Sequence, residues 1–248
     1  MGIRRRFGLI GRNISYSFSR KYFTEKFREL DLKDHEYVNF DLETIGEFKD
    51  KVLSELPILS GCNVTIPYKE QIIPFLEELD PVAKEIGAVN TIKVENDRLI
   101  GFNTDSYGFE KSLRPHLGDH HTKALILGTG GASKAVAYVL DQLGIESAYV
   151  SRSKKRSEDF EYQELTDMII KEHLLIVNCS PVGTFPDINE KPKILYEGIG
   201  KQHVLYDLIY NPEVTAFLKE GMNRGATTQN GLEMLQFQAD RAWEIWNS

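Results

Sequence analysis

The 248-residue chain is poor in several features that would mark a specialised class of protein. Its only cysteines, Cys62 and Cys179, have no Cys-x-x-Cys spacing, so a disulfide framework is excluded. The longest aliphatic runs, such as Leu174–Val177, are far shorter than the roughly twenty residues of a membrane span. The apolar stretch Phe7–Ile10 behind the basic N-terminus is too short for a signal-peptide core. We therefore expect a cytoplasmic protein.

Positive charge is also scarce. Lys and Arg number 30 against 37 Asp and Glu, which gives a formal net charge of −7 and argues against binding along a nucleic-acid backbone. The six histidines include no HExxH motif, and the neighbours His120 and His121 point differently on any regular element, so no metal site is expected. Internal repeats and low-complexity tracts are missing too. What remains is an ordinary globular composition, 41% hydrophobic and 27% charged, of one large domain or two modest ones.

The first hundred residues mix short strands and helices. Phe7–Ile10 and Tyr37–Leu42 have strand patterns. A helical period runs through residues 22–30 after Ser19, the predicted N-cap, and another covers residues 45–56. Asn96-Asp97 separates two further strand patterns, 88–94 and 99–103, and so predicts a hairpin turn.

From Lys123 onward the predicted strands alternate with helices, which indicates a parallel sheet. The predicted strands are Ala124–Leu127, Ala148–Val150, Leu174–Asn178 and His203–Asp207. Gly144 is the predicted stop of the helix behind the first of them. The last helix begins at about Gly231 and carries an apolar stripe that we assign to the core: Leu232, Leu235, Ala239, Ala242 and Trp246.

A glycine-rich turn, Gly128-Thr129-Gly130-Gly131-Ala132-Ser133, joins the first of these strands to its helix. Glycines let a backbone approach phosphates closely, and a helix start offers free N–H groups, so the turn could hold a pyrophosphate. The third glycine of the strict GxGxxG pattern is replaced by Ser133. An ordinary tight strand–helix connection is the alternative.

The end of the next strand bears on which dinucleotide would bind. NAD enzymes usually have a carboxylate there, whereas this chain reads Ser151-Arg152-Ser153-Lys154-Lys155-Arg156. Four cations in five residues suit the 2′-phosphate of NADP, because the planar arginine fork matches a phosphate. A solvated basic loop is the alternative, but directly after a dinucleotide-type turn NADP is favoured over NAD.

The first half contains three polar segments. In Asn63–Lys69, a lysine on a rigid element could lose solvation, acquire a lowered pKa and donate a proton to a developing alkoxide; the alternative is a surface lysine. Asn90-Thr91 and Asn103-Thr104-Asp105 repeat the Asn/Thr character, and helix capping explains only one of these positions. Ser15–Ser19 offers alternate hydroxyls for a polyol or carboxylate, or forms a simple turn.

Eight blocks in order along nearly the whole chain make it resemble the shikimate dehydrogenase family. They are Ser17–Ser19, Asn63–Lys69, Gly87–Thr91, Gly101–Asp105, Gly128–Ser133, Ser151–Ser153 with Arg156, Asp207–Pro212 and Asn230–Gln238. The resemblance implies an α/β fold of two lobes with a cleft between them. Residues 1–104 and 227–248 would form the substrate-binding domain, and residues 105–226 a Rossmann-type NADP-binding domain. The C-terminal helix would return to the first lobe.

The resemblance also implies the chemistry and the residues that carry it. The reaction would be the reversible, NADP-dependent reduction of 3-dehydroshikimate to shikimate in aromatic amino acid (chorismate) biosynthesis, by an oxidoreductase acting on a CH–OH group. Lys69 and Asp105 would be the catalytic pair. The substrate-binding residues would be Ser17, Ser19, Thr65, Asn90, Tyr210 and Gln238. The cofactor-binding residues would be Gly128, Gly130, Gly131, Ala132, Ser151, Arg152, Ser153, Arg156 and Gly231.

The chain departs from the family pattern in the serine motif, where a Pro, a His and a second Pro are replaced by Asn13, Tyr16 and Arg20. Two other functions stay open: a quinate/shikimate dehydrogenase with relaxed substrate or NAD use, and a non-catalytic dinucleotide-sensing module. Besides the small substrate we expect neither nucleic acid nor membrane as a partner, and a monomer or homodimer.

Overall fold

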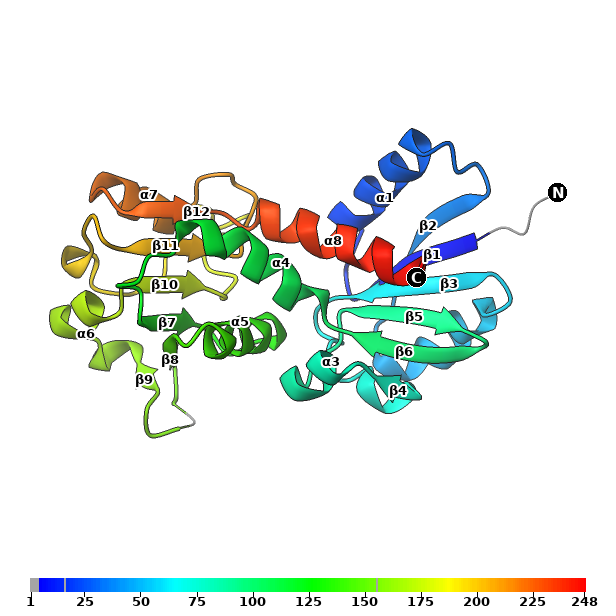
Figure 1. Cartoon of the computed structure of the whole chain (residues 1–248), viewed down its shortest axis with the longest axis horizontal. Helices are drawn as coiled ribbons and strands as arrows, with labels where there is room; N and C mark the ends of the chain where they lie inside the picture. The colour runs from blue at the N-terminus through cyan, green and yellow to red at the C-terminus, as the bar shows by residue number, and fades with distance from the viewer. Residues whose placement is uncertain (1–4, 16, 155) are drawn as a thin grey trace. The chain divides into compact units, whose positions relative to one another are not determined.

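The computed structural model describes residues 5–15, 17–154 and 156–248. Two members of the sequence motifs, Tyr16 and Lys155, lie outside the described residues. The chain divides into two compact units, one formed by Met1–Thr104 with Ala239–Ser248 and the other by Asp105–Gln238. Each unit is built around its own six-stranded sheet (Figure 1).

Strands and helices are mixed in the first hundred residues and largely alternate from β7 onward, as the sequence patterns predicted. The first part of the chain contains β1 (Arg5–Gly11), α1 (Phe18–Glu29), β2 (His35–Asp41), α2 (Phe48–Lys51), β3 (Leu59–Val64), β4 (Glu78–Leu79), α3 (Pro81–Ile86), β5 (Thr91–Glu95), β6 (Arg98–Phe102) and α4 (Thr104–Leu113). The second part contains β7 (Lys123–Leu127), α5 (Gly131–Gln142), β8 (Glu146–Ser151), β9 (Phe160–Glu161), α6 (Asp167–Glu172), β10 (Leu175–Asn178), β11 (Val204–Asp207), α7 (Ala216–Asn223), β12 (Thr227–Gln229) and α8 (Leu232–Trp246).

The sheet of the first unit is mixed, with the strand order β2-β1-β3-β5-β6-β4. β1 pairs in parallel with β2 and β3, whereas β5 pairs antiparallel with both β3 and β6. The β5–β6 hairpin turns at Asn96 and Asp97, which have φ values of 51° and 61°, as expected for a two-residue hairpin loop. The sequence-based prediction of this hairpin is confirmed.

Both faces of the first sheet are covered. One face packs on α2, α3 and the loops around them, through buried side chains such as Ile10, Phe48 and Ile72. The other face packs on α1 and on the C-terminal half of α8, where Trp246 contacts Phe7 at a ring-centroid distance of 4.8 Å. Strands buried on both faces explain the apolar character of this region despite the polar motifs inserted in it.

The sheet of the second unit is entirely parallel, with the order β12-β11-β10-β7-β8-β9. Counted from β7, this is the strand order of the Rossmann dinucleotide-binding fold. Helices α4, α5 and the start of α8 cover one face, and α6 and α7 cover the other. The order reverses between β7 and β10, so the carboxyl ends of these two strands mark the expected ligand position.

Three local predictions from the sequence need correction. The N-cap of α1 is Ser17, whose Oγ accepts from the Arg20 N–H at 3.2 Å, while Ser19 is buried inside the helix. The predicted helix over residues 45–56 is broken into two 3₁₀ turns around the single turn of α2. In the stripe of α8, Leu232 is exposed, and Met234 takes its place in the core.

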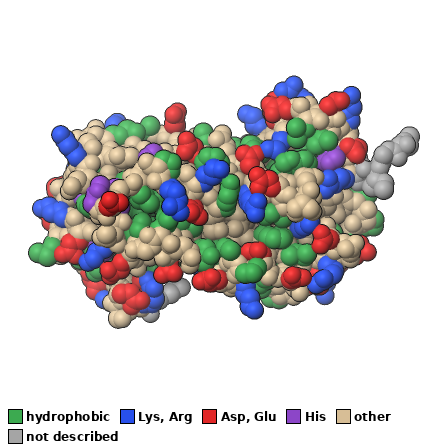
Figure 2. Space-filling model, in the orientation of Figure 1, with side chains coloured by type: hydrophobic (Ala, Val, Ile, Leu, Met, Phe, Trp, Pro, Cys, Tyr) green, Lys and Arg blue, Asp and Glu red, His purple; other side chains and the backbone are tan. Residues whose placement is uncertain are grey.

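Figure 2 shows Lys and Arg interspersed with Asp and Glu over the visible face, with no broad area of one sign. Among the residues that the structure describes, no helix combines the length and the hydropathy needed to cross a bilayer.

Candidate functional site

A buried polar network connects the Asn/Thr motifs of the first unit. The Tyr37 hydroxyl donates to Asn63 Oδ1 at 2.8 Å, and Asn63 Nδ2 donates to Thr91 Oγ1 at 3.2 Å. Asn90 Nδ2 donates to Thr104 Oγ1 at 3.0 Å, while its Oδ1 accepts from the Thr104 N–H at 2.7 Å. A network in which the polar groups have hydrogen-bond partners fixes one rotamer of each side chain. Asn90 is held through both Nδ2 and Oδ1 of its amide.

The serine motif lies next to this network. Ser19 is buried near the Tyr37 hydroxyl, whose pKa is raised well above its ordinary value by burial. The loop before the motif is held from β2, because Asp41 Oδ1 accepts from the Asn13 N–H at 2.8 Å and Asn39 Nδ2 donates to the Ile14 carbonyl at 2.8 Å. Asn13 has a φ of 57°, so the backbone of this loop turns without the prolines of the family pattern.

The two proposed catalytic residues are both attached to the segment that carries Asn90. The backbone carbonyl of Lys69 accepts from the Val89 N–H at 2.8 Å. Asp105 directly follows Thr104, which is bonded to Asn90, and is 7% exposed in the first turn of α4. Lys69 and Thr65 are half-buried. The structure therefore anchors both residues by their backbone neighbours.

The glycine turn of the second unit has the features of a phosphate cradle. Gly128 has a φ of 103°, and a Cβ there would lie 3.2 Å from the Ser180 N–H nitrogen at the end of β10. At Gly130, by contrast, no atom of the described residues lies within 4 Å of a Cβ position. Gly130 is the N-cap of α5, no described side chain caps it, and the first turn contains no carboxylate. The uncapped N–H groups and the open space fit a pyrophosphate.

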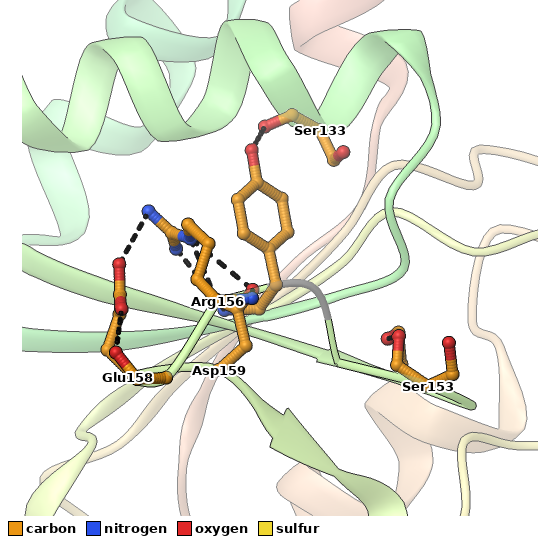
Figure 3. A network of polar contacts seen from close by, with 8 residues as sticks. Ser133, Ser153, Arg156, Glu158 and Asp159 are labelled. Atoms are coloured by element: carbon orange, nitrogen blue, oxygen red, sulfur yellow. Dashed lines mark hydrogen bonds and ion pairs between the residues drawn. The ribbon is translucent and has the colours of Figure 1, made fainter.

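The basic loop after β8 holds Arg156 in a defined position. Asp159, whose side chain is 4% exposed, accepts from Arg156 Nη2 at 2.7 Å and from the Tyr149 N–H at 3.1 Å (Figure 3). Burial acts against the charged carboxylate, but these hydrogen bonds hold the pKa of Asp159 below its ordinary value. Arg152 is exposed, and Ser151 Oγ donates to the Ser153 carbonyl at 2.7 Å. The loop thus presents cations beside the strand end where an NAD enzyme would have a carboxylate.

A second buried carboxylate, Asp207, ties together the loops after β10 and β11. It accepts from Asn178 Nδ2 at 3.0 Å, from the Ile209 N–H at 3.1 Å and from Thr215 Oγ1 at 2.6 Å. Burial raises the pKa of Asp207 to about 6, and these hydrogen bonds only partly offset that effect. Asp207 thereby fixes the start of the segment that carries Tyr210.

The remaining candidate residues lie along the last part of the chain. Tyr210 is 38% exposed, and its pKa is raised by partial burial. Gly231 donates its N–H to the Ile209 carbonyl at 3.1 Å, and a Cβ there would lie 2.1 Å from the Leu208 carbonyl oxygen. Gln238 is buried, with Nε2 donating to the Leu235 carbonyl at 2.9 Å. Close backbone packing thus explains Gly231, and its role in cofactor binding stays a prediction.

Sequence reasoning assigned no individual role to six residues that shape these regions, although Asn63, Thr91 and Asp207 lie in the motifs quoted above: Tyr37, Asn63, Thr91, Asn178, Asp207 and Asp159. Five of them carry a signal, because a polar or aromatic side chain within a strand pattern requires a buried partner. Asp159 has none, since it resembles any acidic residue of a surface loop. Over the described ranges, no group of three or more His, Cys, Asp or Glu is placed to hold a metal ion.

Comparison with known proteins identifies relatives of this chain. The family model of the shikimate dehydrogenase substrate-binding domain matches residues 9–92. The shikimate dehydrogenase (NADP(+)) of Desulforamulus reducens is 36% identical over 96% of this chain and 88% of its own length.

Two solved structures have folds similar to that of this chain. The shikimate 5-dehydrogenase of Thermus thermophilus, in complex with NADP(H) and shikimate, matches with a TM-score of 0.86 and 30% identity over 98% of this chain and 93% of its own. A 5-ketofructose reductase of Gluconobacter matches with a TM-score of 0.83 and 27% identity over 98% of this chain and 92% of its own. With the similarity extending over almost its whole length, the chain belongs to the shikimate dehydrogenase family.

Proposed function

We propose that this chain is an NADP-dependent shikimate dehydrogenase that interconverts 3-dehydroshikimate and shikimate. The observation that carries the proposal is the Asn90 network, which holds the backbone neighbours of Lys69 and Asp105 in one buried arrangement within the first unit. The glycine turn and the basic loop of the second unit support the cofactor part of the proposal. The sequence-based bounds, residues 1–104 with 227–248 and residues 105–226, differ from the compact units at the C-terminal end, because β12 pairs with β11 in the second sheet. Residues 1–104 with 239–248 would therefore form the substrate domain, and residues 105–238 the cofactor domain.

The substrate is a carboxylic acid with hydroxyl groups on a ring, so it needs many hydrogen-bonding partners. In the proposal, Ser17 and Ser19 bind the carboxylate, and Thr65, Asn90 and Gln238 contact the hydroxyls or the carboxylate, with Tyr210 nearby. Support comes from the network described above, because a side chain with a fixed rotamer loses little entropy when it binds a ligand. Asn90 is a member of this network, and Ser19 is buried beside it.

Lys69 and Asp105 would handle the proton of the reaction. NADPH supplies the hydride when bound, and negative charge then develops on the ketone oxygen of the substrate. In the proposal, the Lys69 ammonium donates a proton or hydrogen bond to that oxygen, and Asp105 orients the hydroxyl groups and Lys69. Asp105 directly follows the buried Thr104, and this supports the role because a fixed backbone limits how far the carboxylate can move.

The cofactor would be held by the second unit. Gly128, Gly130, Gly131 and Ala132 would hold the pyrophosphate. The N–H groups of Gly130, Gly131 and Ala132 lie at the start of α5, whereas Gly128, whose N–H donates to the Val150 carbonyl at 2.9 Å, lets the backbone turn. The loop residues Ser151, Arg152, Ser153 and Arg156 would bind the 2′-phosphate, and Gly231 would lie near the cofactor.

The test is a spectrophotometric assay of NADP⁺ reduction with shikimate, run in parallel with quinate and with NAD⁺. We expect the highest kcat/KM for shikimate with NADP⁺. Lys69→Ala should lower kcat by about 10²–10⁴-fold, the usual contribution of a positioned general acid, while shikimate binding persists. Full turnover in Lys69→Ala would refute the assigned role. Equal rates with quinate or NAD⁺ would favour a relaxed quinate/shikimate dehydrogenase, and binding of the dinucleotide without turnover would favour a sensing module. A monomeric or homodimeric state stays a prediction.

A further inference from the structure

The connection between β8 and β9 is short for one that joins two parallel neighbouring strands. The two strands are parallel neighbours, with Val150 paired to Phe160 and Ser151 paired to Glu161. Parallel neighbours normally need a connection of about a dozen residues or more, usually with a helix. Here β8 ends at Ser151 and β9 begins at Phe160, and the described residues between them form no helix. Side-chain contacts must therefore fix the conformation of this loop.

Asp159 supplies most of those contacts. One of its oxygens, Oδ1, accepts from Arg156 Nη2 at 2.7 Å, from Arg156 Nε at 3.2 Å and from the Tyr149 N–H at 3.1 Å. The other, Oδ2, accepts from the Arg156 N–H at 3.2 Å. Asp159 thus binds both the backbone and the guanidinium of Arg156 and ties them to β8.

Tyr149 completes the arrangement. The Arg156 guanidinium carbon lies 5.1 Å from the centroid of the Tyr149 ring, within the range of a cation–π contact. The Tyr149 hydroxyl donates to the Ser133 carbonyl at 3.3 Å, in the first turn of α5. A continuous path of contacts therefore runs from the glycine turn through Tyr149 to Arg156, with Ser153 lying apart from it in Figure 3.

We propose that Asp159 is a positioning residue that holds Arg156 ready for the 2′-phosphate of NADP and so determines the preference for NADP over NAD. This inference rests on the proposed role of Arg156 in cofactor binding. The guanidinium can serve both groups, because it has five N–H donors and Asp159 engages those on Nε and Nη2. A preorganised arginine loses less entropy when it binds a phosphate than one that is free to move.

Electrostatics alone predicts the opposite effect. A carboxylate close to a phosphate repels it, so removal of the Asp159 charge would then strengthen binding of the 2′-phosphate. Glu158 provides the matched control, because it also lies beside Arg156, 3.3 Å from Nη1, but its side chain is 54% exposed and makes no contact with Tyr149 that the structure records. Positioning and repulsion can therefore be separated by comparing Asp159→Asn with Glu158→Gln.

The experiment measures the binding of adenosine 2′,5′-bisphosphate and of AMP to the full chain by isothermal titration calorimetry. In Asp159→Asn we expect the affinity for the bisphosphate to fall about tenfold, a typical effect of disturbing one charge-assisted hydrogen bond, and the affinity for AMP to change less than twofold. Glu158→Gln should keep or increase the affinity for the bisphosphate. Asp159→Glu keeps the charge but displaces it, and it should show the same loss as Asp159→Asn. If Asp159→Asn does not fold, Asp159→Glu provides the test.

A double-mutant cycle with Arg156→Ala adds a readout that general destabilisation would not change. If Asp159 acts through Arg156, Asp159→Asn has no further effect on bisphosphate affinity in the Arg156→Ala background. Additive losses, or wild-type affinity in both Asp159 variants, would overturn the inference.

The outcomes also separate this inference from the proposed function. Loss of bisphosphate affinity in Asp159→Asn without shikimate oxidation by the wild type would refute the proposed substrate and leave the inference standing. Equal binding of AMP and the bisphosphate by the wild type would refute the role of Arg156 and the inference together.

Discussion

The carboxylate of Asp207 should make the stability of this protein depend on pH in a direction opposite to that of most acidic residues. Asp207 is 0% exposed, and burial raises its pKa from 3.8 to about 6. Its three hydrogen-bond donors come from Asn178, Ile209 and Thr215. Asparagine at this position keeps the size of the side chain and the Oδ1 acceptor, and its amide can donate to the Thr215 hydroxyl. Asp207→Asn therefore removes the titration and preserves the packing.

The size of the effect follows from the shift in the pKa. A shift from 3.8 to about 6 is roughly two units, and at 1.36 kcal/mol per unit it corresponds to about 3 kcal/mol. Because the pKa is higher in the folded state, the folded protein retains a proton that the unfolded chain releases. The stabilisation from that proton is complete below pH 3.8 and is lost as the pH rises through about 6.

The assay is urea unfolding of the wild type and of Asp207→Asn at about pH 4.5 and about pH 7.5. Comparing the two proteins cancels the titration of all other groups. We expect the free energy of unfolding of Asp207→Asn, relative to that of the wild type, to increase by about 2 kcal/mol between the two pH values. A difference that stays constant, or that decreases with pH, would show that Asp207 does not have a raised pKa in the folded protein.

Three further predictions concern the packing and the polar network. Gly231→Ala should lower the free energy of unfolding by roughly 1–3 kcal/mol or more, measured by urea unfolding, because its Cβ would overlap the Leu208 carbonyl; an unchanged midpoint would contradict the packing. Tyr37→Phe leaves Asn63 Oδ1 without its donor and should lower the free energy of unfolding by about 1–3 kcal/mol. It should also raise KM for shikimate, with stability and kinetics measured on the same preparation. The Cys62 thiol, whose pKa is raised by burial, should react with a thiol reagent only after unfolding, and rapid labelling of the native protein would contradict this.

Local sequence patterns predict the elements that are apolar and bounded by turn residues, and they fail for short strands without that pattern. β7, β10 and β11 are short apolar runs next to turn residues, and the alternation of strands and helices is enough to predict the parallel sheet. β9 and β12 are short and polar, so their existence depends on pairing with neighbours that the sequence does not reveal.

The choice between Ser17 and Ser19 as N-cap shows the same limit. Both hydroxyls could cap a helix by propensity, but Ser19 is buried within the helix near Tyr37, so tertiary structure decides that Ser17 takes the cap. In the candidate site, motif residues such as Asn90 could be named from the sequence. The contacts that hold Asn90 come from β3, β6 and the start of α4, and only the folded chain brings these elements together.

Helix α8 has a consequence for how the protein is made. Its residues Ala239, Ala242 and Trp246 complete one core of the first unit, although all of the second unit is encoded before them. During synthesis, the N-terminal sheet therefore leaves the ribosome with the hydrophobic surface for these residues uncovered. The strands of both sheets are translated before Ala239–Ser248, so the core that these last residues complete in the first unit is filled only after the whole of the second unit has been synthesised.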